Sequence, residues 1–164
     1  CFVPDNDYRG FLRRRVEGVD DALRGGNFVN TRGEVLGKHE GYPFYTVGQR
    51  KGLGIALGEP MFVTEILPDT NTVVLGQENE LIRNGMMVGK VNLMKYADLP
   101  AEGLEVLSKV RYRDDGVMST VLPMGKDLEV RFHANVKGVA PGQSAVFYEG
   151  DDVVGGGIIQ GSFQ

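Results

Sequence analysis

The stretch "LEVLSKVRYRD", residues 104–114, has the alternation of a β-strand with one side in a core. Its first face carries mainly apolar, small or aromatic side chains, namely Val106, Ser108, Val110 and Tyr112. Its second face carries Leu107 and three cations, Lys109, Arg111 and Arg113. Because side chains alternate between the two faces of a strand, this pattern predicts one buried face and one basic, solvent-facing one.

Similar short runs lie on both sides of this strand. They are "MMVGKVNLMKY" (86–96), "VMSTVLPMG" (117–125), "DLEVRFH" (127–133) and "QSAVFYEGDDVVGGGIIQ" (143–160). Short strands with turns about every 8–12 residues are typical of small β-barrels. We therefore expect a C-terminal antiparallel β-barrel over residues 86–164.

Residues 26–85 are expected to form a smaller central β domain. "FVNTRGEVLG" contains a turn at Arg32-Gly33, and "PFYTVG" is interpreted as a strand. "PMFVTEILPDTNTVVLG" predicts a hairpin whose turn lies at Pro68–Asn71. The boundary with the barrel is placed near Ile82–Gly85, and the fold class is mainly β.

Residues 1–25 contain the one convincing helical pattern. Asp5 or Asp7 can cap a helix whose apolar stripe is formed by Tyr8, Phe11, Leu12 and Val16. This segment is expected to be a helical connector that carries Cys1. Since the chain has no initiator methionine, we expect either processing or an origin as a piece of a longer protein.

Composition limits the function classes. Glycine accounts for 24 of 164 residues, about twice its ordinary share, which favours a turn-rich β protein. No apolar run approaches the length of a membrane span, and the first residues do not resemble a signal peptide. The net charge is −4, and residues 87–164 carry eight basic and ten acidic side chains. A polyanion must therefore be bound by a local arrangement of charges.

The basic face of residues 107–113 is one such arrangement. Three cations in line could follow a phosphate backbone while Tyr112 stacks on a base or donates a hydrogen bond. The alternative is a solvated strand face that Asp114 and Asp115 balance.

The loop "YTVGQRKGLGIALG" (45–58) is a second candidate, because glycines flank Gln49, Arg50 and Lys51. It lacks the hydroxyl residue that follows the lysine of a P-loop, so it is not expected to bind ATP. Either it approaches a partner closely, with two cations and an amide, or it is a flexible hairpin loop.

The remaining candidates are single residues. His39 and His133 have no ligand spacing, so no metal site is expected. Cys1, the only cysteine, has four interpretations: a reactive thiol with a partner upstream, a lipidated residue, an N-terminal nucleophile, or an accident of where the sequence starts.

Four blocks, in this order, resemble the bacterial tRNA-specific 2-thiouridylases. They are "CFVPDNDYRGFL", "GNFVNTRGEVLGKHEGYPFYTVGQRKGLGI", "VRYRD" and "PGQSAVFYEGDDVVGGGII". The resemblance implies an enzyme that replaces the 2-oxygen of the wobble uridine in certain tRNAs with sulfur. ATP, bound by an N-terminal domain missing here, adenylates the base, and a cysteine persulfide delivers the sulfur. The barrel would resemble those of translation factors.

The resemblance also implies roles for individual residues. Cys1 matches the persulfide cysteine, whose partner cysteine, able to form a disulfide with it, would lie upstream. Arg111, Tyr112 and Gln143 match positions that contact tRNA, and Lys109, Arg113, Gln49, Arg50 and Lys51 are weaker candidates. The expected partners are tRNA and a persulfide donor, either a sulfur-relay protein or a cysteine desulfurase.

We expect the intact protein to be a cytoplasmic enzyme without a membrane partner. The present chain alone is expected to bind no cofactor and to be inactive. The alternatives are a non-catalytic β-barrel RNA-binding module and a mature lipoprotein beginning at Cys1.

Overall fold

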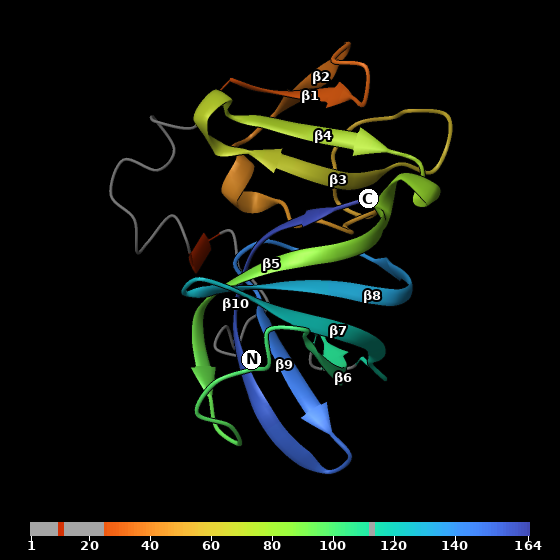
Figure 1. The fold of residues 1–164 in the computed structure, drawn as a ribbon. Helices are drawn as coiled ribbons and strands as arrows, with labels where there is room; N and C mark the ends of the chain where they lie inside the picture. Colours follow the sequence, from red (N-terminus) through yellow and green to blue (C-terminus); the bar gives the residue numbers. More distant parts are fainter. Residues whose placement is uncertain (1–9, 12–24, 112–113) are drawn as a thin grey trace. The chain divides into compact units, whose positions relative to one another are not determined.

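The computed structural model describes residues 10–11, 25–111 and 114–164, and the chain divides into two compact units. The first unit ends at Glu80, and the second runs from Leu81 to Gln164 (Figure 1). Strand β5 begins at Ile82, and the boundary placed from the sequence lies near Ile82–Gly85. The helix predicted over residues 1–25 lies outside the described residues, apart from Gly10 and Phe11.

The first unit contains a four-stranded sheet in the order β2-β1-β4-β3. Its strands are β1 (Gly26–Asn30), β2 (Val35–His39), β3 (Phe62–Leu67) and β4 (Thr72–Gly76). Strand β1 pairs in parallel with β4, and the other two pairings are antiparallel. The predicted hairpin is confirmed: the short 3-10 helix η2 (Pro68–Thr70) and Asn71, with φ 47°, join β3 to β4.

The prediction of a strand at "PFYTVG" is wrong. Tyr42–Phe44 forms the 3-10 helix η1, preceded by Gly41 with φ 136°. Pro43 lies in the first turn of this helix, where its missing N–H costs no hydrogen bond. The apolar character of the segment serves the core, since Phe44 and Tyr45 are buried with Phe28.

The second unit is a closed six-stranded barrel, in the order β10-β5-β8-β7-β6-β9, with antiparallel pairing throughout. The predicted fold class, mainly β with a C-terminal barrel, is thus confirmed. The strands are β5 (Ile82–Leu93), β6 (Leu104–Lys109), β7 (Val117–Met124), β8 (Asp127–Lys137), β9 (Ser144–Glu149) and β10 (Asp152–Phe163). A further 3-10 helix, η3 (Glu78–Leu81), precedes β5.

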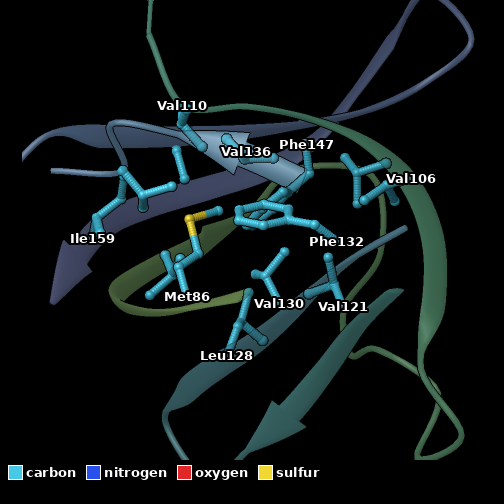
Figure 2. Close-up of a cluster of buried hydrophobic side chains, with 14 residues drawn as sticks. Met86, Val106, Val110, Val121, Leu128, Val130, Phe132, Val136, Phe147 and Ile159 are labelled. Carbon is cyan, nitrogen blue, oxygen red and sulfur yellow. The ribbon is translucent and has the colours of Figure 1, made fainter. Parts of the chain in front are cut away.

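The alternation of β6 holds in the structure. Val106, Ser108 and Val110 are at most 1% exposed, and Val106 and Val110 join the apolar core that surrounds Met86 and Phe132 (Figure 2). The buried hydroxyl of Ser108 forms a hydrogen bond with that of Ser119, so neither is left unsatisfied. The strand ends at Lys109, however, and the described residues that follow, 110–111 and 114–116, are not part of the predicted continuation.

Part of the high glycine content is explained by the closure of the barrel between β5 and β10. A Cβ atom at Gly85 would lie 2.2 Å from the ring of Phe163, and one at Gly89 would lie 1.9 Å from the amide of Gln160. β5 and β10 are paired antiparallel here, and the need for glycine is clearest at Gly85, where the Phe163 ring and the backbone carbonyl of Val130 fill the space that a side chain would take.

Candidate nucleic-acid interface

The barrel has two ends that differ in chemistry. Because its neighbouring strands are antiparallel, the last residues of β6, β8 and β10 lie at the same end as the first residues of β5, β7 and β9. We call this the Arg111 end. The opposite end holds the β9–β10 turn and the segment after β5, and we call it the Lys95 end.

Arg111 reaches across the Arg111 end to a strand that is not its neighbour. Its Nη2 donates a hydrogen bond of 3.0 Å to the carbonyl oxygen of Lys137, the last residue of β8. Its Nη1 lies against Gly138, where a Cβ atom would be 3.5 Å away. The guanidinium is therefore positioned by backbone atoms, and as Arg111 is exposed, its charge faces solvent.

Asp114 fixes the loop that carries Arg111. One carboxylate oxygen accepts a hydrogen bond from the N–H of Val110, and the other accepts one from the N–H of Gly116, both at 3.2 Å. The carboxylate thus links the backbone of Val110 to that of Gly116. Tyr112 and Arg113, which the sequence assigned to RNA, lie outside the described residues.

Gln143 belongs to a turn that begins directly after Lys137. Within this turn Val139 and Ala140 are buried, and the N–H of Gln143 donates to the carbonyl of Ala140 at 3.3 Å. The carbonyl of Gln143 accepts a 2.8 Å hydrogen bond from the N–H of Ile159 on β10. The half-buried Gln143 side chain therefore stands on a rigid segment at the Arg111 end.

Lys109 points elsewhere. Its Nζ lies 5.6 Å from the ring centroid of Tyr148 on β9, whereas Arg111 contacts the end of β8. The cations of this strand face were expected to lie in line. The two described ones diverge instead, because β6 ends at Lys109 and the chain turns before Arg111.

Charge is distributed unevenly between the two ends. In the described part of the barrel, the strand termini and loops of the Arg111 end carry more cations than acids: Arg83, Lys109, Arg111 and Lys137 against Asp114 and Asp115. Those of the Lys95 end carry mostly acids: Asp98, Glu102, Asp127, Glu149, Asp151 and Asp152 against Lys95 and Lys126. The local potential thus favours a polyanion at the Arg111 end.

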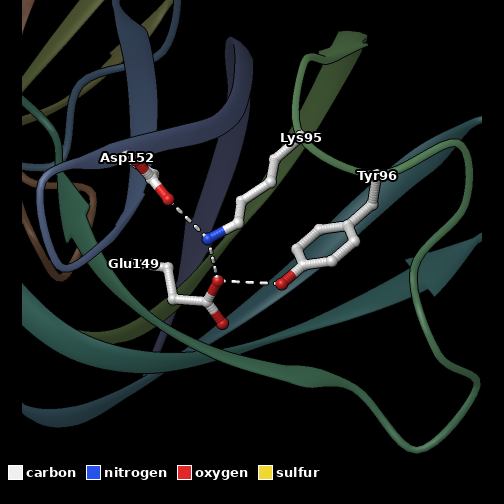
Figure 3. Close-up of polar contacts among 4 residues, drawn as sticks. All are labelled: Lys95, Tyr96, Glu149 and Asp152. Atoms are coloured by element: carbon white, nitrogen blue, oxygen red, sulfur yellow. Dashed lines mark hydrogen bonds and ion pairs between the residues drawn. The ribbon is translucent and has the colours of Figure 1, made fainter.

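The Lys95 end neutralises its own cation. Nζ of Lys95 donates to Glu149 at 2.5 Å and to Asp152 at 2.8 Å, and the hydroxyl of Tyr96 donates to the same Glu149 oxygen at 2.8 Å (Figure 3). The hydrogen bonds to Asp152 and Glu149 raise the pKa of Lys95. The bonds from Lys95 and Tyr96 lower the pKa of Glu149, and the one to Glu149 raises the pKa of Tyr96.

Hydrogen bonds within the loop around Gln49, in the first unit, hold its conformation. The Gln49 side chain accepts a hydrogen bond from the N–H of Thr46 at 3.0 Å and donates one to the carbonyl of Lys51 at 2.9 Å. Backbone hydrogen bonds tie Gly48 and Gln49 to Val63 of β3. Gln49 therefore has a structural task in the part of the loop around residues 46–51.

Arg50 and Lys51 lie on the surface of that loop. The guanidinium of Arg50 is 6.0 Å from the ring centroid of Phe62, and Lys51 is exposed. Arg50 also lines an open hollow of about 510 Å³, whose other walls are mainly backbone and apolar side chains, among them Leu53, Ile55, Leu57 and Met61.

The two histidines have structural surroundings. His39 packs edge-on against the rings of Phe28 and Tyr45, its Nδ1 accepts a 3.0 Å hydrogen bond from the N–H of Gly41, and burial lowers its pKa. Nε2 of His133 lies 2.9 Å from the hydroxyl of Thr120.

Across the described ranges, no group of three or more His, Cys, Asp or Glu side chains is arranged to hold a metal ion. Nor does any helix there have the length and apolarity to cross a membrane.

Sequence reasoning missed Lys137 and the loop role of Asp114. Alternation along β8, with Val136 buried and Lys137 exposed, identifies Lys137 as a surface cation. Only the closure of the barrel brings it beside Arg111. Asp114 was counted as a balancing charge, since a pattern of signs does not show which backbone groups a carboxylate accepts from.

Two family models match the chain. Residues 11–77 match a model described as a tRNA methyl transferase PRC-barrel domain, and residues 83–159 match one described as an aminomethyltransferase beta-barrel domain. The two matches follow the division of the structure into a small sheet unit and a barrel.

Curated relatives match over nearly the whole chain. A protein named tRNA-specific 2-thiouridylase MnmA from Cytophaga hutchinsonii is 58% identical over 164 residues, which is 100% of this chain and 45% of that protein. Proteins of the same name from Amoebophilus asiaticus and Salinibacter ruber are 57% and 46% identical, over 100% and 97% of this chain. These matches cover 44% and 42% of the two relatives, so the chain spans less than half the length of all three.

Proposed function

Because the chain belongs to the family of bacterial tRNA-specific 2-thiouridylases, we propose that it is the RNA-binding, C-terminal portion of an ATP-dependent tRNA thiolase. The intact enzyme converts the wobble uridine of certain tRNAs to 2-thiouridine. This portion contributes an RNA-binding surface and, at Cys1, the residue that carries the sulfur.

In the proposed reaction the 2-oxygen of the uridine attacks the α-phosphate of ATP, and pyrophosphate leaves. The terminal sulfur of a Cys1 persulfide then attacks C2, and the oxygen departs with AMP. A second cysteine, in the remainder of the protein, attacks Cys1 to release the thiolated base as a disulfide forms, or attacks the persulfide first to release sulfide as the nucleophile. Both routes leave Cys1 in a disulfide, which an external thiol reductant reduces with two electrons, and an external persulfide donor then recharges the free Cys1 thiol.

ATP is assigned to the remainder of the protein. The GQRKGLG loop does not have the residues of a P-loop, and its one side-chain amide is used within the loop itself. We therefore expect the present chain alone to bind no nucleotide cofactor and to catalyse no thiolation. The intact enzyme acts in the cytoplasm, where its tRNA substrates are.

The observation that carries the RNA-binding role is the basic Arg111 end. Arg111 and Gln143 are 32 positions apart in the sequence, yet loops on either side of the same barrel end carry them. Each stands on backbone fixed by hydrogen bonds, and the guanidinium of Arg111 is itself oriented by the Lys137 carbonyl, which preorganises it for a ligand. A guanidinium and an amide suit the phosphate, sugar and base-edge groups of RNA.

The test is the substitution Arg111→Ala in the intact protein, with Arg131→Ala as a matched control. Arg131 is an exposed arginine of β8 whose Nε is paired with Glu129 at 2.5 Å. We expect Arg111→Ala to weaken tRNA binding about tenfold and to reduce the salt slope by about 0.7–0.9, the loss of one phosphate contact. The kcat/KM for thiolation falls by the same factor while kcat is kept.

Unchanged tRNA affinity for Arg111→Ala at physiological salt would remove this end from the interface. Intact protein that binds tRNA but yields no thiolated uridine with ATP and a persulfide donor would overturn the reaction and leave an RNA-binding module.

A further inference from the structure

We propose that Lys137 is a further RNA-binding residue, and that the RNA backbone crosses the Arg111 end from β6 to β8 instead of following β6. This inference rests on the proposed function. It concerns the path of the RNA and a contact that the sequence pattern of β6 does not contain.

The first support is the position of Lys137. The hydrogen bond from Arg111 Nη2 ends on the carbonyl oxygen of Lys137, so the guanidinium lies beside the backbone of that residue. Lys137 is exposed, while its neighbour Val136 is buried on the inner face of β8. Lys137 is therefore a surface residue at the place where Arg111 contacts the end of β8.

The second support is the divergence of the cations of β6. Lys109 extends over Tyr148 on β9, away from the contact that Arg111 makes on β8. A phosphate chain running along β6 would pass Lys109 and lose Arg111. A chain crossing the barrel end meets Arg111 and Lys137 together, and two adjacent cations suit the phosphates of one strand.

The third support is the turn that starts at Lys137 and ends at Gln143. Its centre is anchored in the core by Val139 and Ala140, and Gly142 donates a 2.8 Å hydrogen bond to the carbonyl of Ile159. Lys137 and Gln143 thus flank one turn held by hydrogen bonds, with Arg111 against its first residue, Gly138. All three residues therefore belong to the same end of the barrel.

The role of the side chain at 137 can be separated from that of the backbone. Arg111 uses the carbonyl oxygen of Lys137, which any residue at this position retains. Lys137→Ala therefore removes the ammonium group and leaves Arg111 in place. Lys126→Ala is the matched control, because Lys126 is an exposed lysine on the β7–β8 turn at the Lys95 end.

The experiment measures tRNA affinity of the intact protein across a salt series for the wild type, Lys137→Ala, Lys137→Arg and Lys126→Ala. We expect Lys137→Ala to weaken binding about three- to tenfold and to lower the salt slope by about 0.7–0.9. Lys137→Arg restores both values, and Lys126→Ala matches the wild type. In a double variant with Arg111→Ala, the slope falls by about twice that amount.

The outcomes separate this proposal from the one on which it rests. If Lys137→Ala behaves as Lys126→Ala does while Arg111→Ala weakens binding, the RNA does not reach β8 and this inference is wrong, although the RNA-binding role stands. If neither Arg111→Ala nor Lys137→Ala changes binding, both proposals fail. Weakening by Lys137→Ala without a change in salt slope would also contradict a phosphate contact.

Discussion

The cations at the two ends of the barrel have different hydrogen-bond partners. At the Lys95 end, the ammonium of Lys95 donates hydrogen bonds to two carboxylates, Glu149 and Asp152, so the protein's own acidic groups neutralise its charge. At the Arg111 end, the guanidinium of Arg111 meets a backbone carbonyl, which orients it without neutralising it. A cation kept in place by a neutral group remains available to an external anion.

This difference supports the proposed binding of RNA by an acidic chain. The net charge is −4, and the barrel segment alone carries more acids than bases. The antiparallel topology nevertheless gathers basic strand ends on one side and acidic turns on the other. Net charge governs long-range attraction, whereas binding at short range depends on which charges remain uncompensated.

The strongest test of this contrast between the two ends is to remove an acidic side chain from the Arg111 end. Electrostatics alone predicts that Asp114→Ala strengthens the binding of a polyanion, because one negative charge disappears. We expect the opposite, since the carboxylate holds both Val110 and Gly116 and thereby positions Arg111. Each hydrogen bond is worth about 0.5–1.5 kcal/mol, so the loosened loop should weaken tRNA binding about five- to tenfold.

Asp115→Ala is the matched control for that prediction. Asp115 is exposed and adjacent in sequence, and it carries the same charge. Its removal should strengthen tRNA binding by about twofold or less, as expected for a screened surface charge. Opposite signs for the two variants, measured with the intact protein at one salt concentration, would establish Asp114 as a positioning residue. Equal strengthening by both would refute this role.

Local patterns in the sequence predicted much of this fold. The alternation of residues 104–110 identified a strand with a buried face, and the Pro68–Asn71 turn identified the hairpin, because both depend on neighbours in sequence. The segment 43–48 misled for the same reason: Phe44 and Tyr45 are apolar because of their place in the core, while Pro43 and Gly41 set a turn.

The candidate interface was only partly accessible from the sequence. Arg111 and Gln143 came from the resemblance to a family, and alternation placed Lys109 beside Arg111 on one face. Lys137 lies 26 positions from Arg111, and only barrel closure joins them. The direction of Lys109 depends on Tyr148 of a strand that pairs across the seam of the barrel. No local pattern contains either contact.

A second prediction concerns the Lys95 end, where the stability of the barrel should depend on pH. Lys95 and Tyr96 lower the pKa of Glu149 below its ordinary value of 4.5, so the charged carboxylate stabilises the folded barrel above that pH. This contribution is lost as the pH falls through the lowered pKa. We expect Glu149→Gln to reduce the melting temperature of the barrel at neutral pH, with a gap to the wild type that closes in acid.

NMR signals of β9 and β10 provide the measurement, since they report on the barrel unit alone. The control is Asp151→Asn, in the same turn, which should show no gap that depends on pH in this way. Because the cluster is exposed and screened by solvent, the effect is smaller than that of a buried pair. A gap that is constant from neutral pH to acid would show that the carboxylate charge does not matter.

The smallest expected effect is a change in the pKa of Tyr96, measured by NMR, which goes in opposite directions in two variants. The phenol of Tyr96 donates to Glu149, and this bond together with the carboxylate charge raises the pKa of Tyr96 above 10.0, while the nearby charge of Lys95 lowers it. In an NMR titration of the tyrosine ring carbons, Glu149→Gln should therefore bring the pKa of Tyr96 down toward its ordinary value. Lys95→Ala should raise it further. A shift in the same direction for both variants would mean that the three side chains do not share one network. Lys95 would then be less neutralised than the structure indicates, and the contrast with Arg111 would weaken accordingly.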